Sequence, residues 1–162
     1  MKPGDRPQPN PALKDLEILI GAWDMEISEA AFLPDRSATI HMPVSFEWLE
    51  EGAFLILRMG DPAAASPSAL WLIGRDESDS GYKAFYYDDR RVSRIYQMSF
   101  SDRAWKLWRQ SPGFSQRFAG QVSPDGKTIA AQWEKSSDGL TWEHDFNVTY
   151  RARTSASSIM HE

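Results

Sequence analysis

His144 is the residue of this chain best suited to chemistry, because an imidazole exchanges protons and binds metals near neutral pH. Its strand parity is shared by four large apolar or aromatic residues of the segment WEHDFNVTY, namely Trp142, Phe146, Val148 and Tyr150. If that face lines the protein interior, the imidazole either contacts a ligand or is a core histidine that hydrogen bonds to another protein group. We predict no metal site, since His41 lies on a polar face and His161 in the tail.

Arg94, Tyr96 and Gln116 are the other polar side chains on predicted apolar faces. An unpaired buried charge is costly, so an inward Arg94 is either the anchor of an acidic ligand or the partner of a carboxylate such as Asp88. The opposite parity would place Ile95 inward and Arg94 in solvent. Gln116 interrupts an apolar face, as residues that distinguish between ligands often do.

Two further polar clusters have a structural and a chemical interpretation. Four tyrosines on neighbouring predicted strands either line a pocket or pair across the sheet: Tyr82, Tyr86, Tyr87 and Tyr96. The run Asp88-Asp89-Arg90-Arg91 lies between two strands, which favours a solvated turn over an acid–base pair. The chain contains none of the common hydrolase, phosphate-loop, metalloprotease or dinucleotide motifs.

Alternating apolar residues predict that these side chains are carried by β-strands. The clearest example is residues 40–48, where every second residue from Ile40 to Trp48 is apolar. Including a strand from Trp23, we expect about ten short strands, the others at 53–59, 69–76, 81–88, 92–100, 103–110, 114–122, 127–135 and 141–153. The connections leave no room for crossover helices, and Asp-Gly pairs at 125–126 and 138–139 are typical of hairpin turns. We therefore predict an all-β, antiparallel up-and-down barrel in preference to a sandwich.

A short helix is predicted before the first strand. Residues 10–20 place Leu13, Leu16 and Leu19 at helical spacing after Asn10-Pro11, and Gly21 ends the segment. The proline-rich residues 1–11 predict a flexible leader, and residues 155–162 a flexible tail. Residues 12–154 then form a single domain.

Composition limits the classes of partner. The 162 residues carry a formal charge of −5, which would repel a nucleic-acid backbone. The chain has no cysteine, and no apolar run reaches the length of a membrane span or a signal peptide. We expect a cytoplasmic protein with neither nucleic-acid partner nor membrane span.

Two motifs resemble a known family. Leu16 to Trp23 has the form Leu-x-x-Leu-x-Gly-x-Trp, and Trp133 to Trp142 the form Trp-x-x-Ser-x-Asp-Gly-x-x-Trp. In these motifs the chain resembles a bacterial family of uncharacterised lipocalin-like proteins, which implies a calycin-type barrel without a known activity. It is more distantly similar to nitrobindin-like haem barrels, in which a histidine near the position of His144 ligates haem. The glycines that follow the tryptophan in those barrels are absent after Trp23.

These patterns favour a barrel that binds a small hydrophobic or amphipathic ligand, without a cofactor. The predicted apolar lining is Trp23, Phe46, Trp48, Trp133, Phe146 and Tyr150. The polar end of the ligand would meet Arg94, Tyr96, Gln116 or His144.

Two alternatives remain open. An enzyme could use His144 as a base, with Arg94 or Tyr96 stabilising negative charge. A protein-interaction module, or a homodimer, would use outward tryptophans such as Trp71, Trp105 or Trp108.

Overall fold

Residues 10–154, the part of the chain described by this computed structural model, contain ten strands, two short 3₁₀ helices and the loops that connect them. The helices are η1 (Pro11–Leu19) and η2 (Glu50–Gly52). The strands are β1 (Gly21–Ser28), β2 (Ile40–Leu49), β3 (Phe54–Met59), β4 (Ala69–Gly74), β5 (Tyr82–Asp88), β6 (Ser93–Ser101), β7 (Ala104–Arg109), β8 (Ser115–Val122), β9 (Thr128–Ser136) and β10 (Glu143–Ala152). Most of the predicted leader, residues 1–9, and the predicted tail, residues 155–162, lie outside the described residues.

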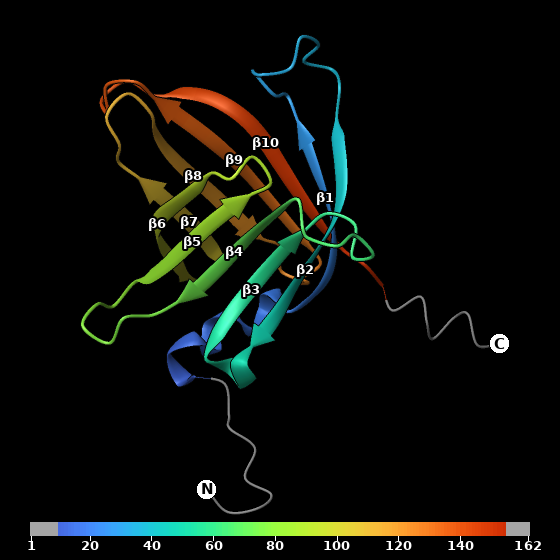
Figure 1. The fold of residues 1–162 in the computed structure, drawn as a ribbon, viewed down its shortest axis with the longest axis vertical. Coiled ribbons are helices and arrows are strands. Elements are labelled where there is room, and N and C mark those ends of the chain that lie inside the picture. The colour runs from blue at the N-terminus through green and yellow to red at the C-terminus, as the bar shows by residue number, and fades with distance from the viewer. Residues whose placement is uncertain (1–9, 155–162) are drawn as a thin grey trace, which may run out of the picture.

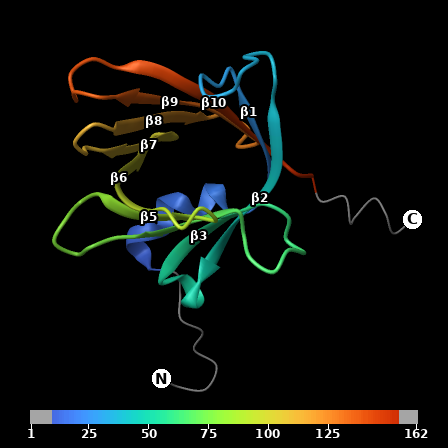
Figure 2. The same cartoon turned by 45° about the horizontal axis from the view of Figure 1, so that its top comes forward.

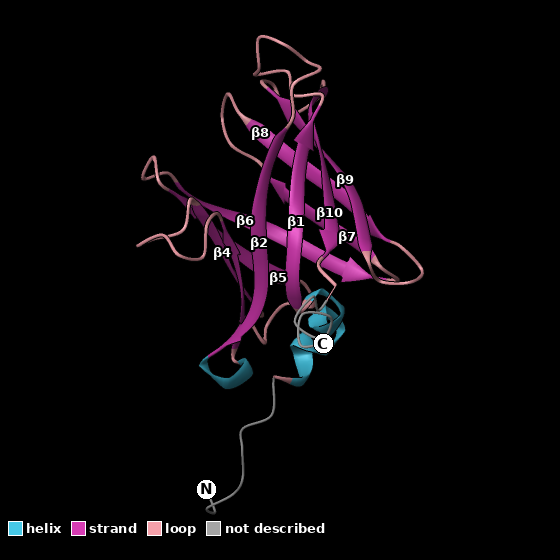
Figure 3. Ribbon diagram, turned by 90° about the vertical axis from the view of Figure 1, so that its right-hand side faces the viewer, coloured by secondary structure: helices cyan, strands magenta, loops and turns pink. Residues whose placement is uncertain are grey.

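Hydrogen bonds between neighbouring strands close the sheet into a barrel (Figure 1). Each strand pairs antiparallel with the next one in sequence, and β1 pairs with β10 to complete the ring. At this closure Met25 lies opposite Tyr150, and β1 is flanked by β2 and β10 (Figure 3). The predicted antiparallel up-and-down barrel is therefore confirmed, and a sandwich is excluded.

Helix η1 packs against one end of the barrel, which we call the closed end (Figure 3). The Asn10 side chain accepts a hydrogen bond from the backbone N–H of Ala12 at 3.0 Å and caps the first turn. Leu13, Leu16 and Leu19 are fully buried in the barrel core. The predicted helix is confirmed as a 3₁₀ helix. Among residues 10–154, no helix has the length and apolar character needed to cross a bilayer.

The opposite end of the barrel, which we call the open end, carries only loops. These are residues 29–39, 60–68, 89–92, 110–114 and 137–142. Figure 2, turned toward this end, shows the strands arranged in a ring. The two ends of the barrel therefore differ, one being covered by a helix and the other bordered by connections.

Strand parity is regular in the middle of the chain. Arg94 and Tyr96 of β6 face inward, whereas Ile95 between them is 61% exposed. Ala69 and Trp71 of β4 also face inward. The alternative with Ile95 inside is therefore wrong.

A β-bulge in β10 changes the parity of His144. Trp133 lies opposite Phe146, but the next residue of β9, Glu134, lies opposite His144, so Asp145 is an extra residue in β10. Phe146 and Val148 face inward, and His144 shares the outer face with Glu134. The expectation that His144 and Phe146 share one face is wrong, because it assumed an uninterrupted alternation.

The Asp-Gly turns form as predicted. Gly126 and Gly139 have φ of 74° and 77°, which a glycine adopts without steric cost. The Asp138 carboxylate accepts hydrogen bonds from the backbone N–H groups of Thr141 and Leu140 and from the Ser136 hydroxyl. These bonds lower the pKa of Asp138 to about 2.

Candidate functional site: an aromatic cavity at the open end of the barrel

A cavity of about 660 Å³ occupies the half of the barrel nearest the open end. Its walls include Trp71, Tyr96, Phe118 and Trp133, and its rim includes Phe32 of the 29–39 loop. The volume lies within the range of pockets that hold small organic ligands. The barrel interior is thus not filled by its own side chains at this end.

The half nearest the closed end is filled. Phe46 lies with its ring centroid 6.3 Å from that of Trp23, 5.9 Å from that of Trp105 and 6.3 Å from that of Tyr150, with steeply inclined planes. Trp48 packs against the same core. Trp105 and Tyr150 also border the cavity, so this aromatic layer forms its floor.

Six of the ten residues predicted for the site line the cavity. They are Arg94, Tyr96, Gln116, Trp133, Phe146 and Tyr150. Trp23, Phe46 and Trp48 face the interior as predicted but belong to the filled half. His144 lies on the outer face of the barrel. The structure therefore brings together the predicted polar set without its histidine.

Trp133 lies at the centre of the aromatic walls. Its ring centroid is 6.2 Å from that of Trp71, with the planes only 22° apart. Phe118 and Tyr96 meet it at steeper angles, with centroids 5.1 and 5.7 Å away. Such offset and edge-to-face contacts hold large rings in fixed positions, which makes this a preformed apolar surface.

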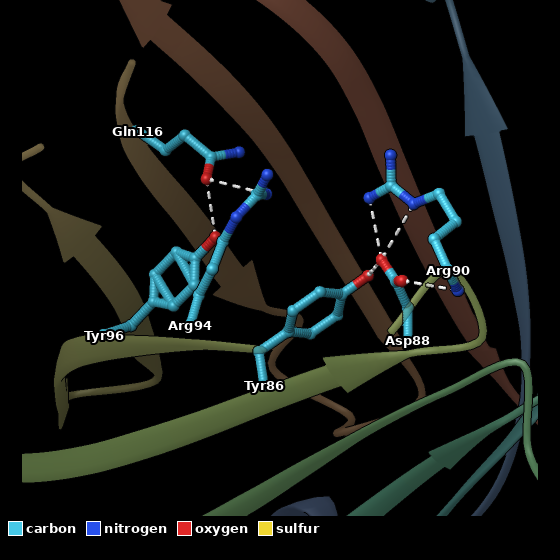
Figure 4. A network of polar contacts seen from close by, with 6 residues as sticks. All are labelled: Tyr86, Asp88, Arg90, Arg94, Tyr96 and Gln116. Atoms are coloured by element: carbon cyan, nitrogen blue, oxygen red, sulfur yellow. Dashed lines mark hydrogen bonds and ion pairs between the residues drawn. The ribbon is translucent and has the colours of Figure 1, made fainter. Parts of the chain in front are cut away.

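Arg94, Tyr96 and Gln116 form the first polar cluster of the cavity (Figure 4). The Tyr96 hydroxyl donates a hydrogen bond of 2.5 Å to Gln116 Oε1, and Arg94 Nη1 donates to the same oxygen at 3.3 Å. The Arg94 guanidinium also lies 5.4 Å from the centre of the Phe114 ring. Burial raises the pKa of Tyr96, so its phenol stays protonated and a donor at neutral pH.

Asp88, Arg90 and Tyr86 form the second polar cluster (Figure 4). Asp88 Oδ2 accepts hydrogen bonds from Arg90 Nη2 at 2.7 Å and from the Tyr86 hydroxyl at 2.8 Å, and Oδ1 accepts from the Arg90 backbone N–H. The Arg90 bond, ahead of the Tyr86 bond, holds the pKa of Asp88 well below its usual range despite burial. Burial and the bond to Asp88 raise the pKa of Tyr86.

This second cluster corrects two predictions. Asp88 pairs with Arg90, so the suggested internal pair between Asp88 and Arg94 is absent from residues 10–154. The 88–91 segment is a turn as predicted, but it is only partly solvated, because Asp88 is 4% exposed and faces the cavity.

The bulged Asp145 lies at the rim beside Lys135, with 4.0 Å between Asp145 Oδ1 and Lys135 Nζ. Burial raises the pKa of Asp145, and the nearby Lys135 opposes that rise. The backbone carbonyl of Asp145 accepts a hydrogen bond of 2.8 Å from the N–H of Ala31. The bulge therefore connects the 29–39 loop to the rim of the cavity.

His144 makes its contacts on the outer face of the barrel. Its Nε2 lies 2.8 Å from Asn147 Oδ1, and Asn147 Nδ2 donates to Glu29 at 2.9 Å. The proposed role of His144 as a base inside the barrel is therefore wrong.

Haem ligation in the cavity does not fit the position of His144 either. No histidine among residues 10–154 lines the cavity. Within those residues, no three His, Cys, Asp or Glu side chains gather in a way that could hold a metal ion.

Trp71 is the main cavity residue that strand parity missed. It lies in the segment ALWLIG, whose two faces are both apolar, so alternation alone cannot assign an inner face. Trp71 and Trp105, predicted as outward, are instead buried. Trp108 alone of the three is exposed, and it borders a groove on the outer face with Phe85 and Ile95.

Comparison with known proteins leaves the family open. No protein-family model and no curated protein matches the chain. Among solved structures, the chain is similar to the crystal structure of Rv2717c from M. tuberculosis, with a TM-score of 0.47 and 11% sequence identity, over 91% of this chain and 100% of that one. Because this similarity is weak, we assign the fold from the strand pairing of the chain itself. The barrel implied by the lipocalin-like resemblance is confirmed, and membership of that family stays a prediction.

Proposed function

We propose that this protein binds a small, mostly apolar ligand inside the barrel. The observation that carries the proposal is the aromatic cavity of about 660 Å³, covered at one end of the barrel and bordered by loops at the other. A chain that needed only a stable barrel would gain from filling that space, because empty apolar volume costs stability. Here the filled half shows that large aromatic side chains pack readily within the same barrel.

The distribution of polar groups also favours a ligand that enters from the open end. The floor is the aromatic layer that contains Trp105 and Tyr150. Charged groups border the cavity near the open end, among them Lys135 of β9 and Arg90 of the 89–92 loop. An apolar body would bury its surface against the floor and walls, gaining about 25 cal/mol for each Å² removed from water. A polar group on the ligand would then remain near Arg94, Tyr96 and Gln116.

Filling the cavity with a side chain tests this proposal. Ala69 borders the cavity and is 8% exposed, so Ala69→Phe would place a ring in the space assigned to the ligand. We expect at least a tenfold loss of affinity for decanol and 2-naphthylmethanol in isothermal titration calorimetry, because the ligand and the ring cannot occupy one volume.

Ala119→Phe is the matched control, since Ala119 is an exposed residue of β8 on the outer face. It should bind both alcohols within twofold of the parent protein. Failure of the parent to bind any apolar probe, or equal losses in the two variants, would contradict the proposal.

A further inference from the structure

Gln116 presents only donors to the cavity. Arginine can donate but not accept hydrogen bonds, so the side-chain oxygen of Gln116 must be the atom that faces Arg94. That oxygen already accepts from Arg94 Nη1 and from the Tyr96 hydroxyl. The Gln116 amide nitrogen, with two N–H groups, has no partner among residues 10–154, although the residue is 7% exposed.

Arg94 differs from the other arginine of the cavity in lacking a carboxylate. Arg90 forms an ion pair of 2.7 Å with Asp88, whereas within residues 10–154 no acidic side chain lies within 4.0 Å of Arg94. The Arg94 guanidinium donates to the neutral Gln116 oxygen and lies over the Phe114 ring, and the residue also borders the outer groove beside Trp108. The guanidinium is thus held in position, and its charge is not neutralised by the protein.

The cavity lining contains three carboxylates, of which the two buried ones are paired. Asp88 accepts bonds from Arg90 and Tyr86, and Asp145 lies beside Lys135. The third, Asp89, is exposed to solvent in the 89–92 loop. Inside the cavity a cationic group would have to displace one of the partners of Asp88 or Asp145, while an anion would meet the free donors of Arg94 and Gln116. The balance of donors and acceptors therefore favours negative charge on the ligand.

We propose that the ligand is an amphipathic anion, an apolar body with one carboxylate or similar acidic group, bound by Arg94 and the Gln116 amide. This inference rests on the proposed function and specifies its ligand. The anionic group would accept from the planar guanidinium and from the amide N–H, a geometry that suits two oxygens on one centre. The apolar body would lie against Trp71 and Trp133 in the cavity wall.

Three probes with one ring system and different charges test this inference. We would compare 2-naphthoate, 2-naphthylmethanol and 2-naphthylmethylammonium by calorimetry with the full-length protein at neutral pH. The parent protein should bind the carboxylate about tenfold to a hundredfold more tightly than the alcohol, the range expected for a charge-assisted hydrogen bond. The ammonium compound should bind most weakly.

Two variants locate the effect. Gln116→Glu is nearly isosteric and gives Arg94 the carboxylate that it lacks, so it should abolish the preference for naphthoate over the alcohol. Arg94→Gln should also remove the preference. Arg91→Gln is the matched control, because Arg91 is exposed in the preceding turn, outside the cavity lining, and the substitution removes the same charge.

The outcomes separate the two proposals. Equal binding of carboxylate and alcohol by the parent, or an unchanged preference in Gln116→Glu and Arg94→Gln, would overturn the anionic ligand while the apolar cavity stands. Binding of none of the three probes would overturn the proposed function itself. If Arg91→Gln lost the preference for naphthoate as completely as Arg94→Gln does, the effect would come from net charge alone. That result would also overturn Arg94 as the anion-binding residue.

Discussion

The two arginines that reach the cavity, Arg90 and Arg94, lie four residues apart in the chain but in different electrostatic surroundings. Arg90 and Asp88 neutralise each other, and Tyr86 completes the hydrogen bonds of that carboxylate. Arg94 is held by the neutral Gln116 and by an aromatic ring. The first group therefore contributes to stability, and the second is the one free to bind a ligand.

Asp88→Asn should lower the free energy of unfolding at pH 7 by about 1 to 3 kcal/mol, because the charge-assisted hydrogen bonds that the buried Asp88 carboxylate accepts are weakened. The pKa of Asp88 is lower in the folded protein than in the unfolded chain, so its contribution is present above the ordinary aspartate pKa and is lost as the pH falls. Urea unfolding from pH 7 to pH 2 should show the parent and the variant converging below about pH 4. A constant difference across that range would contradict this assignment.

At the scale of elements, all ten strands could be predicted, because apolar alternation and Asp-Gly turns are local signals. The bulge at Asp145 could not be predicted, because the extra residue is not a glycine and only the pairing with β9 reveals it. Because of this extra residue, His144 lies on the outer face of the barrel and not in the site. The inner face of β4 was equally hidden, because Leu70, Trp71 and Leu72 are all apolar.

Helix η1 supports the barrel through its leucines, so Leu16→Ala should cost about 2 to 5 kcal/mol of stability by leaving a cavity at the closed end. Lys14→Ala, on the exposed side of the same helix, should stay within about 0.5 kcal/mol of the parent. Urea unfolding at pH 7 followed by circular dichroism measures both. A loss below about 1 kcal/mol for Leu16→Ala would show that η1 is not an integral part of the core.

At the scale of the molecule, the sequence indicated an aromatic interior but not how much of it is filled. Trp23 and Phe46 belong to the filled half, whereas Trp133 lines the cavity. The difference lies in how far each residue is from the open end, and that distance depends on the stagger of the strands. The sequence also could not show which donors and acceptors of the polar residues lack a protein partner, because that depends on the three-dimensional contacts. Self-association through the outer groove beside Trp108 stays a prediction.

The most direct test of the central claim uses the indole N–H signals of the tryptophans in a ¹H–¹⁵N spectrum. Titration with 2-naphthylmethanol should shift the signals of Trp71, Trp105 and Trp133, which border the cavity. Trp108 and Trp142 lie outside the cavity lining and should be unaffected. Shifts confined to Trp108, or no shift of the three cavity tryptophans at saturating probe, would contradict a ligand site inside the barrel.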